Sequence, residues 1–156
     1  MDVEELSVFL VESNAAGYAG GDERLWSSES DGSTTIRFSR ELWSSHDNFF
    51  GGEPYGGRTV VFFNDRPVWM MVYYGWVAEQ ADPDQTYRVL RKALMHMPGD
   101  APYRGPERYG EGALIYSNKW DGAIQRFSGD EEIHEGERLV YRATYLGGLV
   151  DSRRGV

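Results

Sequence analysis

Residues 66–75 read Arg-Pro-Val-Trp-Met-Met-Val-Tyr-Tyr-Gly, and residues 138–147 read Arg-Leu-Val-Tyr-Arg-Ala-Thr-Tyr-Leu-Gly. The stretches lie 72 residues apart, and at that offset identical residues are Arg66/Arg138, Val68/Val140, Tyr73/Tyr145 and Gly75/Gly147. The match continues upstream without a gap at Tyr55/Phe127, Gly57/Gly129 and Val61/Ile133. We interpret the pattern as one hairpin present twice. It predicts two related halves about a pseudo-two-fold axis, where such folds often place a cleft.

Both copies of the repeated strand keep an aromatic face, because side chains on a strand alternate between the two faces of a sheet. That face carries Trp69, Met71 and Tyr73 in the first copy, and Tyr141, Ala143 and Tyr145 in the second. One interpretation is that the face forms the core beneath the helices. The other is that part of it lines a ligand cleft, since Trp and Tyr combine apolar area with a polar tip. Both hold if the cleft lies at the edge of the core.

The segments around the hairpins predict an α+β domain in which two helices pack on an antiparallel sheet. Apolar residues at helical spacing predict helices over 3–15 and 84–97, each followed by a Tyr-x-Gly turn. Further strands are predicted at 34–40, 58–63, 113–118, 123–127 and 131–134. We expect a long loop up to Ser33, a turn region with a short strand over 41–50, and irregular backbone over the Gly-rich stretch 51–57. The chain is then one domain with halves of about 1–77 and 78–150.

The charge balance argues against nucleic acid as a partner. The chain has 25 acidic and 16 basic residues, a net charge of −9, and the basic residues are scattered. Lys92 and Lys119 are the only lysines. An acidic chain with few lysines is typical of a protein from a high-salt cytoplasm. A GC-rich genome, which also favours Arg over Lys, is the alternative.

The residues that are absent restrict the class of protein further. No cysteine is present, which excludes disulfides, thiolate metal sites and a Cys nucleophile and fits a cytoplasmic protein. No apolar run reaches the roughly 18 residues of a membrane span, and the acidic N-terminus is not a signal peptide. We expect neither a membrane nor a cofactor as a partner, and these features are compatible with a homo-oligomer.

The titratable residues form no recognised catalytic motif. His46, His96 and His134 have no metal-binding spacing, so no metal is expected. The Gly-rich stretch 51–57 lacks the Gly-Lys-Ser/Thr ending of a phosphate loop and precedes no helix. Carboxylates that would serve acid–base catalysis are Asp47, Glu53, Glu131 and Glu132.

Arg104 is the strongest candidate for binding an anion. It stands within Pro102-Tyr103-Arg104-Gly105-Pro106, where the prolines restrict the backbone beneath its side chain. A guanidinium group can bind a carboxylate or a phosphate with two parallel hydrogen bonds. The alternative is that Arg104 pairs with an acid of the other half and ties the halves together.

The chain resembles a known family at five places: Tyr18-Ala19-Gly20-Gly21, Asp47 with Gly51-Gly52, residues 67–75, residues 102–106 and the closing hairpin, residues 127–148. That family is a prokaryotic domain of unknown function, found alone or behind an Xre-type helix-turn-helix. Its fusion to regulators implies a sensing or regulatory module. The family carries no established reaction, so the resemblance assigns no catalytic residue.

These observations favour a non-catalytic domain that binds or senses a small molecule. We expect its ligand to be small, partly aromatic or apolar, and anionic to match Arg104. The predicted binding residues are Trp69, Met71, Tyr73, Tyr103, Arg104, Tyr141 and Tyr145. Two alternatives stay open: an enzyme that uses Asp47, Glu53 or Glu132 with Arg104, and a protein-interaction module that uses exposed aromatic residues, including Trp26, Trp43 and Trp76.

Overall fold

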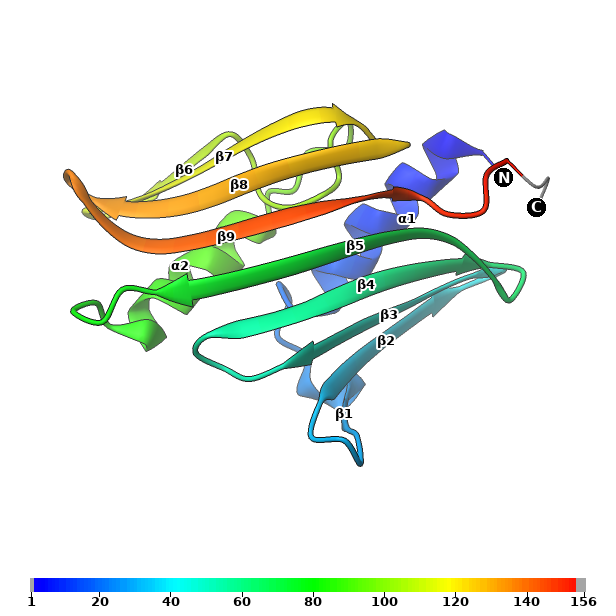
Figure 1. The fold of residues 1–156 in the computed structure, drawn as a ribbon, viewed down its shortest axis with the longest axis horizontal. Helices are drawn as coiled ribbons and strands as arrows, with labels where there is room; N and C mark the ends of the chain where they lie inside the picture. Colours follow the sequence, from blue (N-terminus) through cyan, green and yellow to red (C-terminus); the bar gives the residue numbers. More distant parts are fainter. Residues whose placement is uncertain (1, 154–156) are drawn as a thin grey trace.

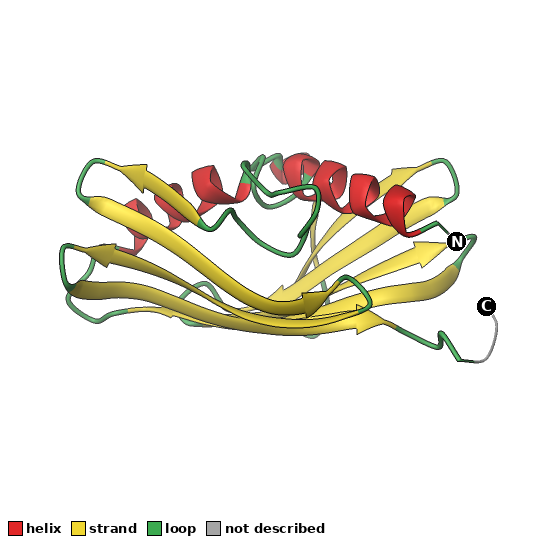
Figure 2. Ribbon diagram, turned by 90° about the horizontal axis from the view of Figure 1, so that it is seen from above, coloured by secondary structure: helices red, strands yellow, loops and turns green. Residues whose placement is uncertain are grey.

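The structure is a computed structural model, and it describes residues 2–153. All its strands form one antiparallel sheet in the order β1-β2-β3-β4-β5-β9-β8-β7-β6. Both helices pack on the same face of that sheet (Figures 1 and 2). The predicted α+β class is therefore confirmed. The elements are α1 (Val3–Ala16), η1 (Glu23–Leu25), β1 (Trp26–Ser28), β2 (Thr34–Arg40), β3 (Trp43–Phe50), β4 (Tyr55–Phe63), β5 (Arg66–Val77), α2 (Pro83–Leu94), β6 (Arg108–Glu111), β7 (Leu114–Ala123), β8 (Arg126–Glu135) and β9 (Arg138–Leu149).

Local sequence signals explain where both helices begin. The side chain of Asp2 accepts a hydrogen bond from the backbone N–H of Glu4, and Asp82 does the same for Asp84 and Gln85. These N-caps satisfy amide groups that have no partner inside the helix. Both helices lie close to the expected ranges, but α2 ends at Leu94, before the Met97 that the apolar spacing suggested. Neither helix in the described chain is long and apolar enough to cross a membrane.

The two repeated strands, β5 and β9, are neighbours at the centre of the sheet, and Tyr73 lies opposite Tyr145. Within the two hairpins the registers correspond at the offset of 72 residues, because Gly57 pairs with Tyr73 and Gly129 pairs with Tyr145. The bulges correspond too, at Val61/Phe62 and at Ile133/His134. These shared features support the duplication, which stays a proposal.

Several of the expected strand boundaries were wrong. β3 is a full strand over residues 43–50, and its polar residues had suggested a turn region. β4 begins at Tyr55, so Gly56 and Gly57 belong to the sheet. A Cβ atom at Gly57 would lie 2.4 Å from the backbone oxygen of Asn48, which explains a glycine inside a strand. β7 continues to Ala123, past the turn expected near Trp120. The strand expected over 123–127 spans the turn between β7 and β8, and β8 runs without a break over residues 126–135. The loop expected before Ser33 contains η1 and β1.

The aromatic face of β5 and β9 lies beneath the helices. Trp69, Tyr141 and Tyr145 are almost fully buried. The opposite face is open, and Tyr74 and Trp76 are exposed on it. The expectation that Trp26, Trp43 and Trp76 form an exposed aromatic surface was wrong in part. Trp43 is buried in the core and Trp26 is half-buried, whereas Trp76 is exposed.

Candidate functional site

A cavity of about 650 Å³ lies between the helices and the β2–β5 side of the sheet. Five of the seven predicted binding residues line it: Trp69, Met71, Tyr73, Tyr103 and Arg104. Tyr141 and Tyr145 do not line it and are buried beside it. The first half supplies α1 and the strands of the floor, and the second half supplies α2 and the turn that carries Arg104. Residues of both halves therefore form the cavity wall.

The floor carries a carboxyl group, that of Asp47 on β3. Its Oδ1 atom accepts hydrogen bonds from the Tyr73 hydroxyl at 2.5 Å and from the Thr59 hydroxyl at 3.2 Å. Its Oδ2 atom accepts none from residues 2–153. Burial raises the pKa of Asp47, because loss of water disfavours the ionised form more than the two hydroxyl donors favour it. Burial, with the charge of Asp47, raises the pKa of Tyr73 as well.

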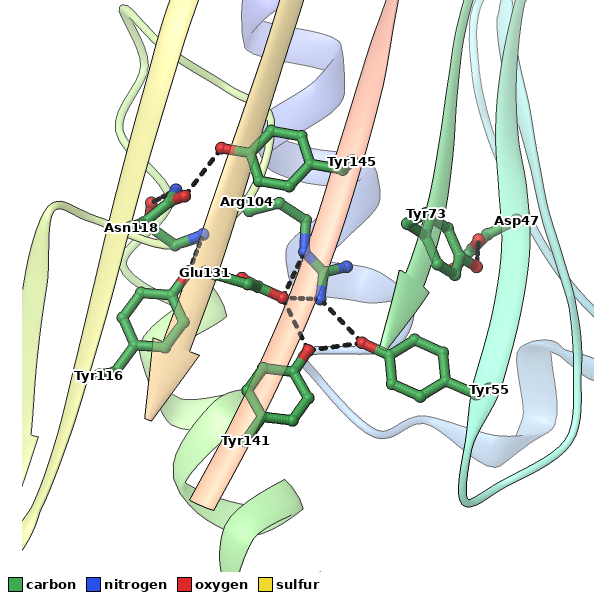
Figure 3. A network of polar contacts seen from close by, with 10 residues as sticks. Asp47, Tyr55, Tyr73, Arg104, Tyr116, Asn118, Glu131, Tyr141 and Tyr145 are labelled. Carbon is green, nitrogen blue, oxygen red and sulfur yellow. Dashed lines mark hydrogen bonds and ion pairs between the residues drawn. The ribbon is translucent and has the colours of Figure 1, made fainter. Parts of the chain in front are cut away.

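Arg104 and Glu131 form a buried ion pair beside the cavity (Figure 3). Arg104 donates to Glu131 Oε1 through Nε, at 2.9 Å, and through Nη2. The hydroxyls of Tyr116 and Tyr141 also donate to Glu131, at 2.6 Å and 2.8 Å. The four hydrogen bonds compensate a carboxylate that has no exposed surface. Glu131 keeps the pKa of Arg104 well above its usual value, although burial acts to lower it.

Tyrosine hydroxyls extend this network to the other half of the protein. The hydroxyls of Tyr55 and Tyr141 lie 2.6 Å apart, and Arg104 Nη2 donates to Tyr55 at 3.4 Å. Arg104 therefore pairs with an acid, as the sequence alternative expected, but the expected location was wrong, because Glu131 lies in the same half as Arg104. The tie to the first half runs through Tyr55. The guanidinium also lies 5.6 Å from the centre of the Tyr73 ring.

Two further arginines, Arg88 and Arg91 on α2, also line the cavity, and Arg91 lies against two aromatic rings. The Arg91 side chain is the candidate for binding. Its guanidinium carbon lies 4.8 Å from the ring centre of Tyr18 and 5.7 Å from that of Trp26. These are cation–π distances. No carboxylate between residues 2 and 153 forms an ion pair with Arg91. The Arg91 Nε and Trp26 Nε1 atoms are buried and have no hydrogen-bond partner in that range. Two buried donors therefore lie unpaired at the same place in the wall.

The other predicted candidates lie apart from this site or serve the fold. Glu53 accepts hydrogen bonds from the backbone N–H of Val77, at 2.7 Å, and from the Tyr87 hydroxyl, and so anchors the loop before β4. Glu132 lies within ion-pair distance of Arg142 and His134. Within the described chain no group of three His, Cys, Asp or Glu side chains could hold a metal ion. Of the three acids proposed to act with Arg104, only Asp47 shares the cavity with it.

Sequence reasoning did not identify Arg91 or Trp26 as residues of a binding site. Arg91 counted only among the scattered basic residues, and Trp26 was named only for an interaction module. A signal was present, since Tyr87 precedes Arg91 by four residues and therefore lies on the same side of α2. Nothing in the sequence indicated that Tyr18 and Trp26 pack against that side.

The fold and site define a small α+β domain with a ligand-sized cavity between a sheet and two helices. The chain belongs to the family DUF5680, described as a domain of unknown function, whose profile matches residues 47–150. The expected membership of a family of unknown function is thereby confirmed, while prokaryotic origin and association with Xre-type regulators stay predictions. No curated protein and no solved structure matches the chain.

Proposed function

We propose that this protein binds a small, partly aromatic molecule in the cavity and acts as a non-catalytic sensory module. The observation that carries the proposal is the cavity itself, whose volume of about 650 Å³ lies in the usual range for ligand sites. Its wall combines aromatic and aliphatic side chains with a few polar groups, as such sites do. A cavity between helices and sheet also lets a ligand change how the helices pack, which suits a sensor.

The cavity is tested by filling it. Thr59 lines the floor, so Thr59→Phe places a ring in the cavity. Thr144 is exposed on β9, so Thr144→Phe is a matched control. A thermal-shift screen of aromatic acids, amines and alcohols is run on all three proteins. A ligand at a hundred times its Kd stabilises the fold by about 2.7 kcal/mol. We expect compounds that stabilise the wild type and Thr144→Phe but not Thr59→Phe. Equal shifts in all three proteins would contradict the proposal.

An enzyme that uses Asp47 as an acid or base is the second candidate. The observation that favours it is the raised pKa of a carboxyl group in a cavity, which is typical of catalytic acids and bases. Mass spectrometry of each stabilising compound after incubation with the protein separates the candidates. A sensor returns the compound unchanged. An enzyme converts it, and Asp47→Asn abolishes the conversion.

A further inference from the structure

The polar floor of the cavity has a counterpart in the second half of the sheet. Asp47 lies opposite Thr59 in the β3–β4 pair, and Asn118 lies opposite Glu131 in the β7–β8 pair. Asp47 accepts a hydrogen bond from Tyr73 of the central strand β5, and Asn118 accepts one from Tyr145 of the central strand β9. The two halves thus share one arrangement of paired polar residues, but the carboxylate stands on different members of the pair. It is Asp47, opposite Thr59, in the first half and Glu131, opposite Asn118, in the second.

The two carboxylates differ in how they are compensated. Glu131 accepts four hydrogen bonds, two of them from the guanidinium of Arg104. Asp47 accepts two hydrogen bonds, both from neutral hydroxyls and both on Oδ1. Asp47 also borders the cavity. Asp47 is half-buried, and its Oδ2 atom has no hydrogen-bond donor among residues 2–153, so Oδ2 is suited to accept an N–H or O–H group from a ligand.

Arg91 is the complementary group elsewhere in the cavity wall. It is a cation held against Tyr18 and Trp26, without an ion-pair partner in residues 2–153. The Nε1–H group of Trp26 is an additional unpaired donor there. Both groups can only donate hydrogen bonds, so they require an acceptor. The guanidinium of Arg91, with its planar arrangement of donors, matches a carboxylate in geometry and in charge.

We propose that the ligand is an aryl carboxylate that carries a hydrogen-bond donor at its far end. Its carboxylate binds Arg91 beside Trp26, its donor binds Oδ2 of Asp47, and its ring lies among the aromatic side chains between them. This inference rests on the proposed binding function and adds the chemical class and orientation of the ligand. It moves the anion site from Arg104, whose charge is already paired with Glu131, to Arg91.

The test compares three nearly isosteric probes by isothermal titration calorimetry: p-aminophenylpropionate, its neutral amide, and p-tolylpropionate, in which a methyl group replaces the amine. The acetate and butyrate homologues cover other chain lengths. We expect the wild type to bind the amide and the tolyl acid each at least about tenfold more weakly than p-aminophenylpropionate. That factor is the scale of a lost hydrogen bond to a charged group.

Variants then assign each end of the probe. Arg91→Gln should abolish the preference for the acid over its amide, and Asp47→Asn should abolish the preference for the amine over the methyl group. Lys119→Gln is the control, because Lys119 is exposed on β7 and lies outside the cavity wall. It removes one positive charge and should leave the Kd of every probe unchanged.

The outcomes separate this inference from the proposed function. If acid and amide bind the wild type equally tightly, the inference is overturned while binding in the cavity stands. An equal loss of affinity in Arg91→Gln and Lys119→Gln also overturns it, since the effect is then one of net charge. If no homologue binds, charged or neutral, both proposals fail. Should Arg91→Gln not fold, the comparison of acid and amide on the wild type decides alone.

Discussion

Tyr73 and Tyr145 lie opposite each other in the central β5–β9 pair, yet their hydroxyls meet chemically different partners. Tyr73 donates to the carboxyl group of Asp47 at 2.5 Å, and Tyr145 donates to the amide of Asn118 at 2.8 Å. The first half therefore places an ionisable group, Asp47, on β3 at the cavity. The second half places its carboxylate, Glu131, on β8, where Arg104 neutralises it.

The raised pKa of Asp47 makes the stability of the protein depend on pH. The folded state binds this proton more tightly than the unfolded chain, whose Asp pKa is near 3.8. The contribution of Asp47 to stability is thus fully present below that pH and is lost as pH rises through the folded pKa. We expect Asp47→Asn, which still accepts from Tyr73, to be more stable than the wild type at neutral pH, with the difference vanishing in acid.

Urea unfolding from about pH 3 to pH 8 measures this dependence, and Asp130→Asn is the control of opposite sign. Hydrogen bonds from Thr144 and Arg142 lower the pKa of Asp130. Its contribution to stability is present above the unfolded pKa and is lost as pH falls through the folded one. Asp130→Asn should therefore be less stable than the wild type at neutral pH. A loss of stability in Asp47→Asn at neutral pH would count against the raised pKa.

Removing one member of the Arg104–Glu131 pair is predicted to destabilise the fold strongly. Arg104→Met leaves Glu131 charged and fully buried without its cation, at a cost of about 3–5 kcal/mol. The double variant Arg104→Met/Glu131→Gln removes both charges and should recover part of that loss. Urea denaturation gives the free energies of unfolding for the double-mutant cycle.

A surface pair provides the comparison for that cycle. Arg37 and Glu29 lie 2.9 Å apart, and the Arg37 side chain is about half exposed. Arg37→Met should cost less than about 1 kcal/mol, because solvent screens exposed pairs. Similar losses of unfolding free energy in Arg37→Met and Arg104→Met would show that the buried ion pair stabilises the fold no more than an exposed one.

Gly129 is predicted to tolerate no side chain. A Cβ atom there would lie 2.3 Å from the ring of Tyr145 and 2.8 Å from the backbone oxygen of Lys119. We expect Gly129→Ala to lower the free energy of unfolding by about 1–3 kcal/mol, the range for overpacking. Gly52→Ala is the control, because no atom lies within 4 Å of its Cβ position. Thermal unfolding of both variants tests this, and equal melting temperatures would refute it.

The net charge of −9 predicts that salt stabilises the protein, as expected for a chain adapted to high salt. Between about 0.1 M and 1 M NaCl the Debye length falls from roughly 10 to 3 Å, which screens repulsion among carboxylates. The melting temperature should rise over this range. The double variant Glu79→Gln/Glu137→Gln removes two exposed charges and should show a smaller rise. A flat or falling melting temperature in the wild type would contradict the prediction that salt stabilises this acidic chain.

The sequence alone determined the helices, most of the strands and the aromatic face of the repeated strands. These features depend on residues a few positions apart. Asp2 and Asp82 cap helices through amides two or three residues on. The alternation at Trp69, Met71 and Tyr73 places those side chains on one face. β3 was underestimated for the same reason, since its polar side chains break the local apolar alternation that marks a strand.

Only the tertiary structure decided which residues share the site. Asp47 is 26 residues from Tyr73, Arg104 is 27 from Glu131, and Arg91 is far along the chain from Tyr18. Such contacts depend on strand order and on how each helix lies across the sheet, and no local pattern encodes either. The sequence could therefore place an arginine near aromatic residues but could not say that Glu131 already pairs with Arg104 and leaves Arg91 without an ion-pair partner among residues 2–153.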